Sequence, residues 1–358
     1  MLKSNFYKKK ILITGHTGFK GSWLTLWLNK LGANIMGISL DIPSSPSNFN
    51  AIKIKKNIID RRFDLKDIDR LKKEINIFRP NYIFHLAAQS LVKSSYTNPK
   101  KTWETNLMGT INLLEVLKNA KFSTSVVIVT SDKCYLNKEK KTGYQEFDEL
   151  GGLDPYSASK ASVEIMVKSY IKSFFNKKKN IRIATARAGN VVGGGDWSKD
   201  RLIPDCVKCW AKNKFSIIRN PESVRPWQHV LEALHGYLLL AIALKKNNNF
   251  HGQNFNFGPS LNKFYKVKNI LKEIKLYWPG IKWKIAKKNS FYESNLLLLN
   301  SSKSKKKLGW NCLLNFSDCM KMISSWYVVY YSRRKDILKF SISQIDNYEN
   351  LLCLKKNG

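Results

Sequence analysis

The sequence of 358 residues contains few cysteines and no long apolar run. Six cysteines in a chain of this length exclude a scaffold held together by disulfides. A membrane-spanning helix needs roughly 18–20 apolar residues, and no stretch approaches that length. The segment from Met1 to Lys10 is polar and basic, unlike a secretory signal peptide. These features predict a soluble, cytoplasmic protein without membrane insertion.

One pair of cysteines has a spacing that is typical of metal and redox sites. Cys206 and Cys209 form a CxxC motif inside a predicted helix. Zinc requires four ligands, and the sequence has neither a second CxxC motif nor a nearby pair of histidines to supply the others. We therefore expect both thiols to pack inside the protein, and we expect no metal.

Acidic residues are scarce: 26 stand against 62 lysines and arginines, which gives a formal net charge of +36. Such an excess is common in nucleic-acid-binding proteins. Here the lysines are spread along the whole chain, and short runs such as Lys8–Lys10, Lys177–Lys179 and Lys305–Lys307 fall in predicted loops and helix ends. The pattern favours solvated lysines over a specific nucleic-acid site, and the charge attracts small anionic molecules.

The segment from Lys10 to Asp41 has the pattern strand, turn, helix, strand. Ile11–Ile13 predicts a strand buried on both faces. Gly32 stands where a left-handed residue ends a helix, and Ile35–Leu40 predicts a second strand. The apolar residues of the intervening helix recur about every four positions and predict one buried face: Trp23, Leu24, Trp27, Leu28 and Leu31.

Three glycines, Gly15, Gly18 and Gly21, form the turn of this segment with the spacing GxxGxxG. They allow a tight turn, the approach of backbone N–H groups to a pyrophosphate, and close packing of helix against strand. The helix N-terminus then attracts the anion. A carboxylate at Asp41 suits an adenosine ribose and repels a 2′-phosphate, which favours NAD over NADP. The predicted cofactor contacts here are Gly15, Thr17, Gly18, Phe19, Gly21 and Asp41.

The alternation of predicted strands and helices continues to about Gly189. This order is typical of an α/β fold, a Rossmann doubly wound parallel sheet whose ligands bind beyond the carboxyl ends of the strands. Further strands are expected at Ile58–Phe63, Asn81–Leu86, Ser125–Thr130 and Ile181–Arg187, and helices at Lys66–Phe78, Lys100–Asn119 and Pro155–Phe175. Two more groups of cofactor contacts follow strand ends: Asp64 and Leu65, beside the adenine, and Leu86, Ala87, Ala88 and Gln89.

Beyond Gly189 the pattern is less regular. Gly193–Gly195 predicts a flexible loop, and the tail after Arg334 has no interpretable pattern. We predict an NAD-binding domain over residues 1–189 with returning segments near 230–258, and a smaller C-terminal α/β substrate-binding cap over residues 190–358. Expected elements are helices at Leu202–Trp210, Leu231–Leu244, Val267–Trp278, Ser301–Leu308 and Phe316–Tyr331, and a strand at Asn254–Phe257.

Tyr156 and Lys160 stand four residues apart at the start of the predicted helix Pro155–Phe175. Residues at this spacing share one helix face. A cationic lysine beside a phenol favours the phenolate and lowers its pKa. A tyrosine so activated can remove a proton from a hydroxyl while hydride leaves the same carbon. Asp154-Pro155 is a suitable helix entry. The pair is predicted to be catalytic.

A second polar group ends the predicted strand Ser125–Thr130. Ser131 is placed to hydrogen-bond the reacting hydroxyl, Asp132 is a candidate general acid, and Lys133 adds a cation. The alternative for this group is a turn capped by the aspartate side chain. Its place beyond a strand end of a dinucleotide fold favours the catalytic interpretation.

Together these residues resemble the extended short-chain dehydrogenase/reductase superfamily, and more narrowly the CDP-glucose 4,6-dehydratase family. The resemblance covers about residues 10 to 260, and Leu308-Gly309-Trp310 is similar to a further family element. It is carried by the blocks TGHTGFKGSWL, HLAAQ, TSDKCY, GGLDPYSASK, RAGNVVGGGDW, DRLIPD and RNPESVRPWQHV.

The resemblance implies a redox-neutral elimination with NAD retained throughout. Tyr156 would take the C4-hydroxyl proton while hydride passes to the cofactor, and Lys160 would lower the pKa of Tyr156 and hold the nicotinamide ribose. Asp132 would protonate the leaving 6-hydroxyl, water would be lost across C5–C6, and hydride would return to C6. The implied product is CDP-4-dehydro-6-deoxyglucose, a precursor of deoxy sugars in surface polysaccharides such as lipopolysaccharide O-antigen. Relatives are commonly homodimers.

Lys133 departs from this scheme, and the residues that bind the nucleotide are less well defined by the sequence than the catalytic residues. Related dTDP-glucose dehydratases have a glutamate where Lys133 stands, so either Lys133 is neutral and acts as the C5 base, or it stabilises the enolate while another group takes the proton. For the nucleotide end the candidates are Asn190, Arg201, Leu202 and Arg225, because guanidinium groups suit diphosphate oxygens. Trp227 and His229 are expected to support the site without touching the ligand.

Other functions agree less well with these residues. A 4-epimerase needs no acid to expel the 6-hydroxyl, so Asp132 favours a dehydratase, although a dTDP- or GDP-sugar dehydratase is a further alternative. A non-catalytic NAD-binding or polyanion-binding protein has no need of Tyr156, Lys160 and Asp132 together.

Overall fold

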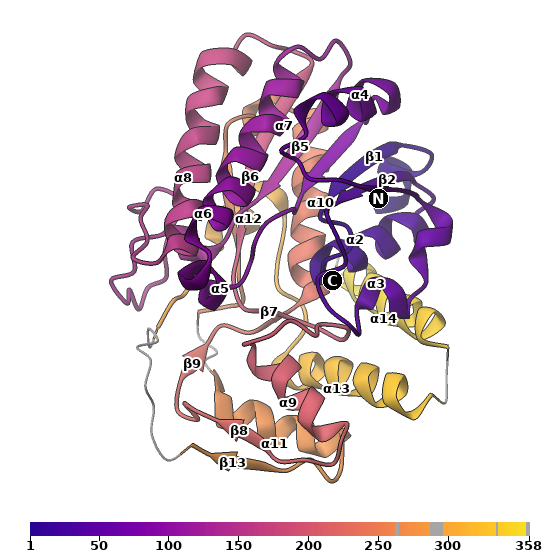
Figure 1. Cartoon of the computed structure of the whole chain (residues 1–358), viewed down its shortest axis with the longest axis vertical. Helices are drawn as coiled ribbons and strands as arrows, with labels where there is room; N and C mark the ends of the chain where they lie inside the picture. Colours follow the sequence, from indigo (N-terminus) through magenta and orange to yellow (C-terminus); the bar gives the residue numbers. More distant parts are fainter. Residues whose placement is uncertain (262–264, 287–295, 334–335, 356–358) are drawn as a thin grey trace.

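The computed structural model describes residues 1–261, 265–286, 296–333 and 336–355. Figure 1 shows a larger unit built around a parallel sheet and, below it in this view, a smaller unit of helices and short strands. Within the described ranges, no helix combines the length and the apolar character that are needed to cross a membrane.

Seven strands form one parallel sheet in the order β11-β6-β5-β4-β1-β2-β3. The chain builds from β1 to β3 on one side and then crosses to β4, so the order reverses between β1 and β4. This arrangement confirms the predicted doubly wound fold, whose ligands bind at such a reversal. The strands are β1 (Lys10–Thr14), β2 (Asn34–Ser39), β3 (Ile59–Arg62), β4 (Tyr82–His85), β5 (Thr124–Val129), β6 (Ile181–Ala188) and β11 (Asn254–Phe257).

Apolar side chains on both faces of the sheet explain why its strands read as continuous apolar runs. Ile11 and Ile13 of β1 pack into one buried cluster with helices α2 (Phe19–Lys30) and α10 (Val230–Lys246). Leu12, between them, packs into a second cluster on the opposite face. That cluster contains α4 (Ile68–Phe78), α7 (Gly109–Lys118) and α8 (Pro155–Tyr170). The predicted return of residues 231–244 to the core is confirmed.

Most predicted elements are present, and two predicted long helices contain a π-helical turn. These turns are Glu104–Met108, between α6 (Pro99–Trp103) and α7, and Ile171–Phe175, after α8. The other helices of the larger unit are α1 (Leu2–Phe6), α3 (Asn48–Ala51), α5 (Val92–Thr97), α12 (Ser302–Leu308) and α14 (Ile337–Leu354), with 3-10 turns at Ile54–Asn57, Asp132–Cys134 and Asn248–Phe250.

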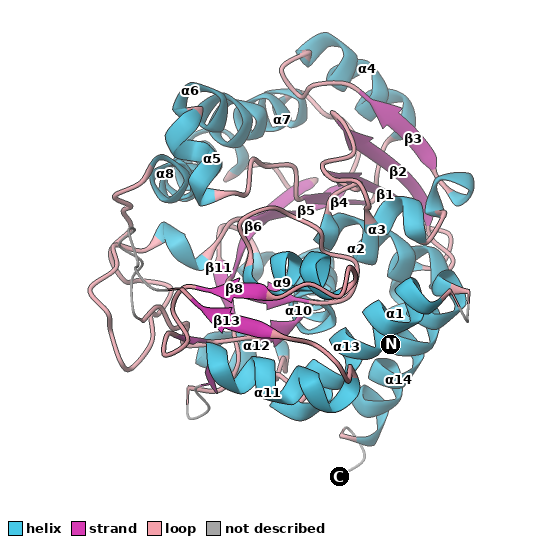
Figure 2. Cartoon of the chain, turned by 60° about the horizontal axis from the view of Figure 1, so that its bottom comes forward, coloured by secondary structure: helices cyan, strands magenta, loops and turns pink. Residues whose placement is uncertain are grey.

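The smaller unit contains α9 (Leu202–Trp210), α11 (Val267–Tyr277) and α13 (Phe316–Ser332), as predicted. Figure 2 shows its paired strands β8 (Ser216–Ile218) and β13 (Trp283–Ile285) beside α11. Two further pairs join β9 (Val224–Arg225) to β12 (Tyr265–Lys266) and β7 (Val191–Val192) to β10 (Gln228–His229). All three pairs are short, so helices supply most of this unit.

The sequence predicted that α2 is buried on one face only, but the structure buries it on other sides as well. Residues Gly21–Leu28 are all buried, including Thr25 and Leu26, which lie off the predicted stripe. The reason is that α3, α10 and α14 all contact α2, and α14 lies in the part of the chain to which the sequence assigned no structure. Figure 1 shows α14, in yellow, beside α2, and the two helices are in contact.

Gly193–Gly195 form a loop, as predicted, but the loop is buried, whereas the sequence suggested a flexible one. All three glycines are buried, and the indole of Trp23 donates a hydrogen bond of 2.8 Å to Gly194 O. A Cβ atom on Gly194 would lie 2.1 Å from the Trp326 ring of α13. Cβ atoms on the other two glycines would meet Val230 and Asn48, respectively. Trp23 and Trp326 both contact Gly194, which thereby joins α13 of the smaller unit to α2.

Candidate active site

The structure brings the predicted motifs together at the carboxyl ends of β1, β4 and β5. Thr14 pairs in register with His85, and His85 pairs with Ile128. The loops that follow these residues therefore leave the sheet side by side. Leu86 N donates to Thr14 O at 3.0 Å, which fixes the loop after β4 against the glycine turn after β1.

The glycine turn has no room for side chains. Gly15 has a φ of +76°, and a Cβ atom there would lie 2.7 Å from Ala87 N. A Cβ atom on Gly21 would lie 2.1 Å from Gly15 O. Gly18 is the N-cap of α2 and offers no side chain to its first N–H groups. The cradle therefore fits a dinucleotide pyrophosphate, which these N–H groups would hold.

The predicted adenosine contacts follow β2 and β3. Asp41 is exposed, its Oδ1 accepts a hydrogen bond of 2.7 Å from Ile42 N, and Thr17 Oγ1 donates to its carbonyl oxygen at 2.6 Å. Leu65 is buried in the core with its carbonyl oxygen bonded to Asn112, whereas the carboxylate of Asp64 is partly exposed. An exposed carboxylate after β2 fits the ribose of NAD.

Tyr156, Ser131 and Asp132 form one hydrogen-bonded group. Ser131 Oγ donates to Asp132 Oδ1 at 2.9 Å and is also hydrogen-bonded to the Tyr156 phenol. All three side chains are largely buried. A Cβ atom on Gly189 would lie 1.8 Å from Asp132 Oδ2, so this carboxylate packs directly on backbone. The structure therefore joins the two predicted catalytic segments.

The pKa of Tyr156 differs from the prediction. Burial raises the pKa of Tyr156 to about 12, and the Asp132 charge adds to this rise, while the contact with the Ser131 hydroxyl and the Arg201 charge oppose it. Lys160 does not produce the expected lowering. Its Nζ lies 3.4 Å from Val129 O, on the sheet side of α8, and burial lowers its own pKa to about 8. Tyr156 and Lys160 share one face of α8, but the Tyr156 hydroxyl and the Lys160 ammonium group point to different places.

Lys20 is a cation at the site whose role the sequence did not reveal. It lies in the first turn of α2, and its Nζ is 3.5 Å from the Tyr237 hydroxyl of α10. Burial lowers the pKa of Lys20 to about 8, as do the Arg201 and Lys160 charges, while the Asp132 charge raises it. The only sign of Lys20 in the sequence was its position between the second and third glycines of the turn.

Lys133, the other predicted cation, is half-buried, and its backbone N–H donates to Ser131 Oγ.

Asn106 is a second residue of the site that the sequence analysis did not identify. It lies in the π-helical turn Glu104–Met108 and is buried. Its side chain accepts from Gln89 N at 2.8 Å and donates to Gln89 O and to Ser159 Oγ of α8. Such turns are frequent at functional sites. Asn106 joins the predicted cofactor loop Leu86–Gln89 to the helix of Tyr156, and an asparagine inside a helical pattern was its only signal.

The predicted nucleotide-binding residues lie in different places. Arg201 reaches the site: its guanidinium contacts Asp196 Oδ2 at 3.1 Å and Ser90 Oγ at 3.3 Å, and its charge acts on Tyr156. Leu202 follows it as the first residue of α9. Asn190 has a φ of +49° just after β6. Arg225 lies on β9, in the antiparallel pair with β12.

His229 and the CxxC cysteines occupy supporting positions. His229 is fully buried, and its Nδ1 accepts the N–H of Leu231 at the start of α10, while the Trp227 side chain packs partly buried against the core. Cys206 is buried and Cys209 is half-buried on α9. Within the described ranges, no three potential ligands converge as they would around a metal ion.

Comparison with known proteins defines the family of this site. Residues 12–323 match the family model for GDP-mannose 4,6 dehydratase. A protein of Salmonella typhimurium described as CDP-glucose 4,6-dehydratase is 40% identical over 354 residues, which cover 97% of this chain and 98% of that protein. The chain belongs to the sugar-nucleotide 4,6-dehydratases. It is therefore an NAD-dependent hydro-lyase of the extended short-chain dehydrogenase/reductase superfamily.

Solved structures agree with this fold. A dTDP-glucose 4,6-dehydratase from Bacillus anthracis in complex with NAD has a TM-score of 0.72 at 21% identity, covering 91% of this chain and 97% of that one. The epimerase Mth375 from Methanothermobacter thermautotrophicus has a TM-score of 0.81 at 22% identity, covering 93% and 96%. At these identities the likeness concerns the fold. The dehydratase fold is thus shared with epimerases, and the reaction must be argued from the residues of the site.

Proposed function

We propose that this dehydratase converts CDP-glucose to CDP-4-dehydro-6-deoxyglucose and water. The observation that carries the proposal is the hydrogen-bonded group of Ser131, Asp132 and Tyr156 beside the glycine cradle. An epimerase would need only the tyrosine, whereas a dehydratase also needs an acid for the leaving hydroxyl. The choice of CDP is supported by the Salmonella typhimurium relative, which is similar along almost the whole chain.

The site residues would divide the reaction between them. Tyr156 takes the C4-hydroxyl proton, and Ser131 and Arg201 favour its phenolate. The glycine cradle would hold NAD, which would supply the hydride acceptor for C4 oxidation and the hydride donor for C6. Asp132 gives its proton to the departing 6-hydroxyl, next to the Ser131 hydroxyl that bonds it. The 4-keto group acidifies C5–H, which makes the elimination feasible.

Lys133 is proposed to act at C5, as the base or as a cation that stabilises the enolate. It follows Asp132 directly and is half-buried. A Lys133→Met variant removes both roles, so solvent deuterium should no longer enter C5. If exchange persists unchanged, another group performs this step.

The two units would bind different parts of the ligands. The predicted NAD-binding domain, residues 1–189 with the returning segments near 230–258, would hold NAD, because β11 is the end strand of the sheet that carries the cradle and α10 packs on that sheet. Residues 190–358 would mainly bind the sugar nucleotide, with Asn190, Arg201, Leu202 and Arg225 toward the diphosphate and base. Arg201 supports this division, since it lies between the smaller unit and Tyr156.

We further propose that the enzyme works in the cytoplasm as a homodimer and supplies deoxy sugars for surface polysaccharides such as O-antigen. Sugar-nucleotide substrates are made in that compartment. Dimerisation would use the helices of the larger unit, and sedimentation analysis tests it directly.

Incubation with CDP-, UDP-, dTDP- and GDP-glucose tests the substrate. A 4-keto-6-deoxy product should form fastest from CDP-glucose, as measured by mass spectrometry. Turnover of another nucleotide without CDP-glucose turnover would contradict the CDP assignment, and epimerised product without loss of water would contradict the reaction.

A further inference from the structure

A buried ion pair lies directly behind the catalytic segments. Glu164 stands on α8, four residues after Lys160, and its Oε2 lies 2.9 Å from Arg187 Nη2 on β6. The two side chains are 3% and 1% exposed, respectively. A buried ion pair adds little stability compared with apolar packing. Its presence behind an active site therefore points to another reason.

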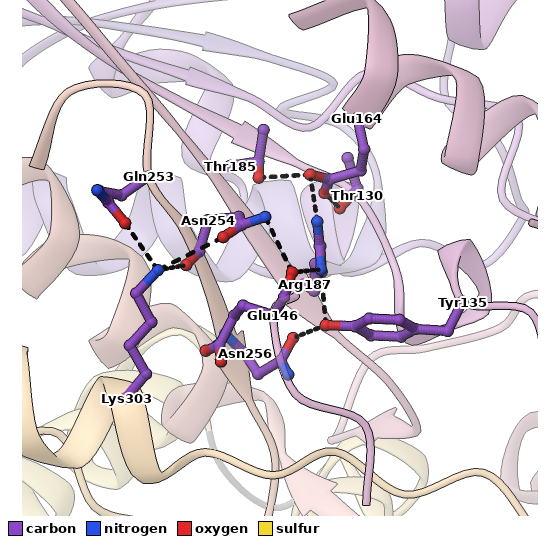
Figure 3. A network of polar contacts seen from close by, with 10 residues as sticks. All are labelled: Thr130, Tyr135, Glu146, Glu164, Thr185, Arg187, Gln253, Asn254, Asn256 and Lys303. Atoms are coloured by element: carbon purple, nitrogen blue, oxygen red, sulfur yellow. Dashed lines mark hydrogen bonds and ion pairs between the residues drawn. The ribbon is translucent and has the colours of Figure 1, made fainter. Parts of the chain in front are cut away.

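Both oxygens of the Glu164 carboxylate are occupied, as Figure 3 shows. Oε1 accepts from Thr130 Oγ1 at 2.5 Å. Oε2 accepts from Thr185 Oγ1 at 2.7 Å and from Arg187. The carboxylate is thus held between the end of β5, strand β6 and helix α8, and it cannot turn without breaking a hydrogen bond in the interior.

The other terminal nitrogen of Arg187 extends the network. Nη1 donates to the Tyr135 hydroxyl at 2.7 Å and to Glu146 O at 3.1 Å. The Tyr135 hydroxyl in turn donates to Asn256 Oδ1 of β11 at 2.8 Å. Figure 3 shows Thr130 and Tyr135 on different sides of Arg187, each pointing into the same network.

The two anchored residues flank the catalytic turn. Thr130 directly precedes Ser131 and Asp132, and Tyr135 follows the 3-10 turn that contains Asp132. Both ends of the turn are therefore tied to one ion pair. Glu164 itself belongs to the helix of Tyr156 and Lys160. The Glu164–Arg187 ion pair is therefore a non-covalent link that sets the distance between the turn of Ser131 and Asp132 and the helix of Tyr156.

The pair also has an electrostatic effect. Burial raises the pKa of Glu164, but the Arg187 charge and the hydrogen bonds from Arg187, Thr130 and Thr185 outweigh it, so the net shift is downward and the carboxylate is charged. For Lys160, burial lowers the pKa and the Glu164 charge is the first force that opposes this. Glu164 therefore favours the charged form of Lys160.

We propose that Glu164 and Arg187 are positioning residues of the dehydratase, which hold the turn of Ser131 and Asp132 in register with Tyr156 and place a carboxylate one helix turn from Lys160. Neither side chain reaches the substrate, because both are buried behind the turn. The proposal rests on the dehydratase function for its assay, and it requires only that the wild-type enzyme turns over some sugar nucleotide.

Two isosteric variants separate positioning from stability. Thr130→Val and Thr185→Val each remove one hydroxyl that bonds the same carboxylate, but only Thr130 belongs to the catalytic turn. We expect Thr130→Val to lower kcat by about tenfold with little change in KM, as small misplacements of catalytic groups do. Thr185→Val should keep kcat within about twofold at a similar thermal midpoint. Equal kcat losses in the two variants would overturn the positioning role.

The charge is tested by Glu164→Gln. The family resemblance assigns Lys160 to the nicotinamide ribose, which it would hold as a cation, so loss of its charge should limit activity at high pH. Without the Glu164 carboxylate the pKa of Lys160 falls, and the alkaline limb of the kcat/KM–pH profile should move to lower pH by about one unit. Glu232→Gln is the control, because Glu232 is another buried glutamate with several hydrogen bonds, on α10 and bonded to Leu313, Leu314 and Tyr348. The Glu232→Gln variant should leave the alkaline limb of the pH profile at its wild-type position. An unmoved limb in Glu164→Gln would refute the electrostatic role.

Tyr135→Phe provides a milder variant should Glu164→Gln fail to fold. It removes only the hydroxyl that links the turn to Arg187, and the ring remains stacked on Tyr144. We expect a lower kcat with an unmoved alkaline limb, since the charges stay. Wild-type kcat in both Tyr135→Phe and Thr130→Val would refute the proposal, whereas an inactive wild type would instead contradict the proposed function.

Discussion

The indole Nε1 of Trp27 donates a hydrogen bond of 2.8 Å to Glu349 Oε1 and so joins the helix of the glycine cradle to the last described helix. Lys30, less than one turn further along α2, pairs with the other oxygen of Glu349 and with Asp346. Because Trp27 is fully buried, its N–H depends on Glu349. Helix α14 thus supports the cofactor helix from behind.

Glu349→Ala should therefore destabilise the protein by about 1–3 kcal/mol, since it leaves a buried donor without an acceptor. Asp346→Ala is the matched control, because it removes only a half-exposed contact of Lys30 and should cost under about 0.5 kcal/mol. Urea unfolding measures both. Equal effects of the two variants would mean that the Trp27 bond contributes nothing.

Gly21→Ala should abolish NAD binding. The new Cβ atom would collide with Gly15 O, so the turn must open and its N–H groups lose their common direction. Gly109→Ala, inside α7, meets nothing closer than 3.7 Å and should bind NAD normally, with a gain of about 0.5–1 kcal/mol in stability. Calorimetric titration compares them. Wild-type NAD affinity in Gly21→Ala would show that the turn is not the cradle.

Asp132→Asn should separate the elimination from the steps before it. An amide keeps the shape against Gly189 but has no acidic proton, so water loss should slow by about 10²-fold or more. In deuterated water the recovered substrate should still gain deuterium at C5. Product formation at the wild-type rate would exclude Asp132 as the acid.

Tyr156→Phe should retain NAD binding and lower turnover by about 10²-fold or more, because the phenol is the proposed proton acceptor and lies outside the cradle. Tyr170→Phe makes the same change near the end of α8, where the hydroxyl bonds only Glu115 among its described contacts, and should have full activity. Initial rates with CDP-glucose test the pair. Comparable rates in both variants would remove Tyr156 from its role.

His229 should contribute to acid denaturation. Burial lowers its pKa to about 3, whereas an unfolded chain binds the proton near pH 6.5. Between these values the unfolded state holds more protons, so stability falls as pH falls, by about 1.4 kcal/mol per pH unit. His229→Asn keeps an N-cap for α10 and should flatten this slope between about pH 6 and pH 4. An unchanged slope would show that His229 does not take up the proton; His85, whose pKa burial also lowers to about 3, remains in the variant.

Local patterns predicted the sheet and the cradle because their causes lie within a few residues. Ile11–Ile13 alternates between two buried clusters, and Gly21 is required by its close contact with the backbone of Gly15, six residues earlier. Gly15 has a positive φ in the turn itself, although the backbone that its Cβ atom would meet belongs to Leu86 and Ala87, from the loop after β4. The ion pair of Glu164 and Arg187 was not predicted, because nothing in the sequence around either residue distinguishes it from other charged residues. Only the packing of α8 on β6 makes them a pair.

The sequence by itself determined the doubly wound fold and indicated the candidate NAD cradle and the two candidate catalytic segments, because periodicity, glycine spacing and the YxxxK motif act over short distances. Tertiary structure decided the rest. It buried the loop of Gly193–Gly195, packed α14 against α2, and placed Lys160 Nζ beside Val129 O instead of beside the Tyr156 phenol. These outcomes depend on burial and on the direction of side chains, which contacts between distant segments establish.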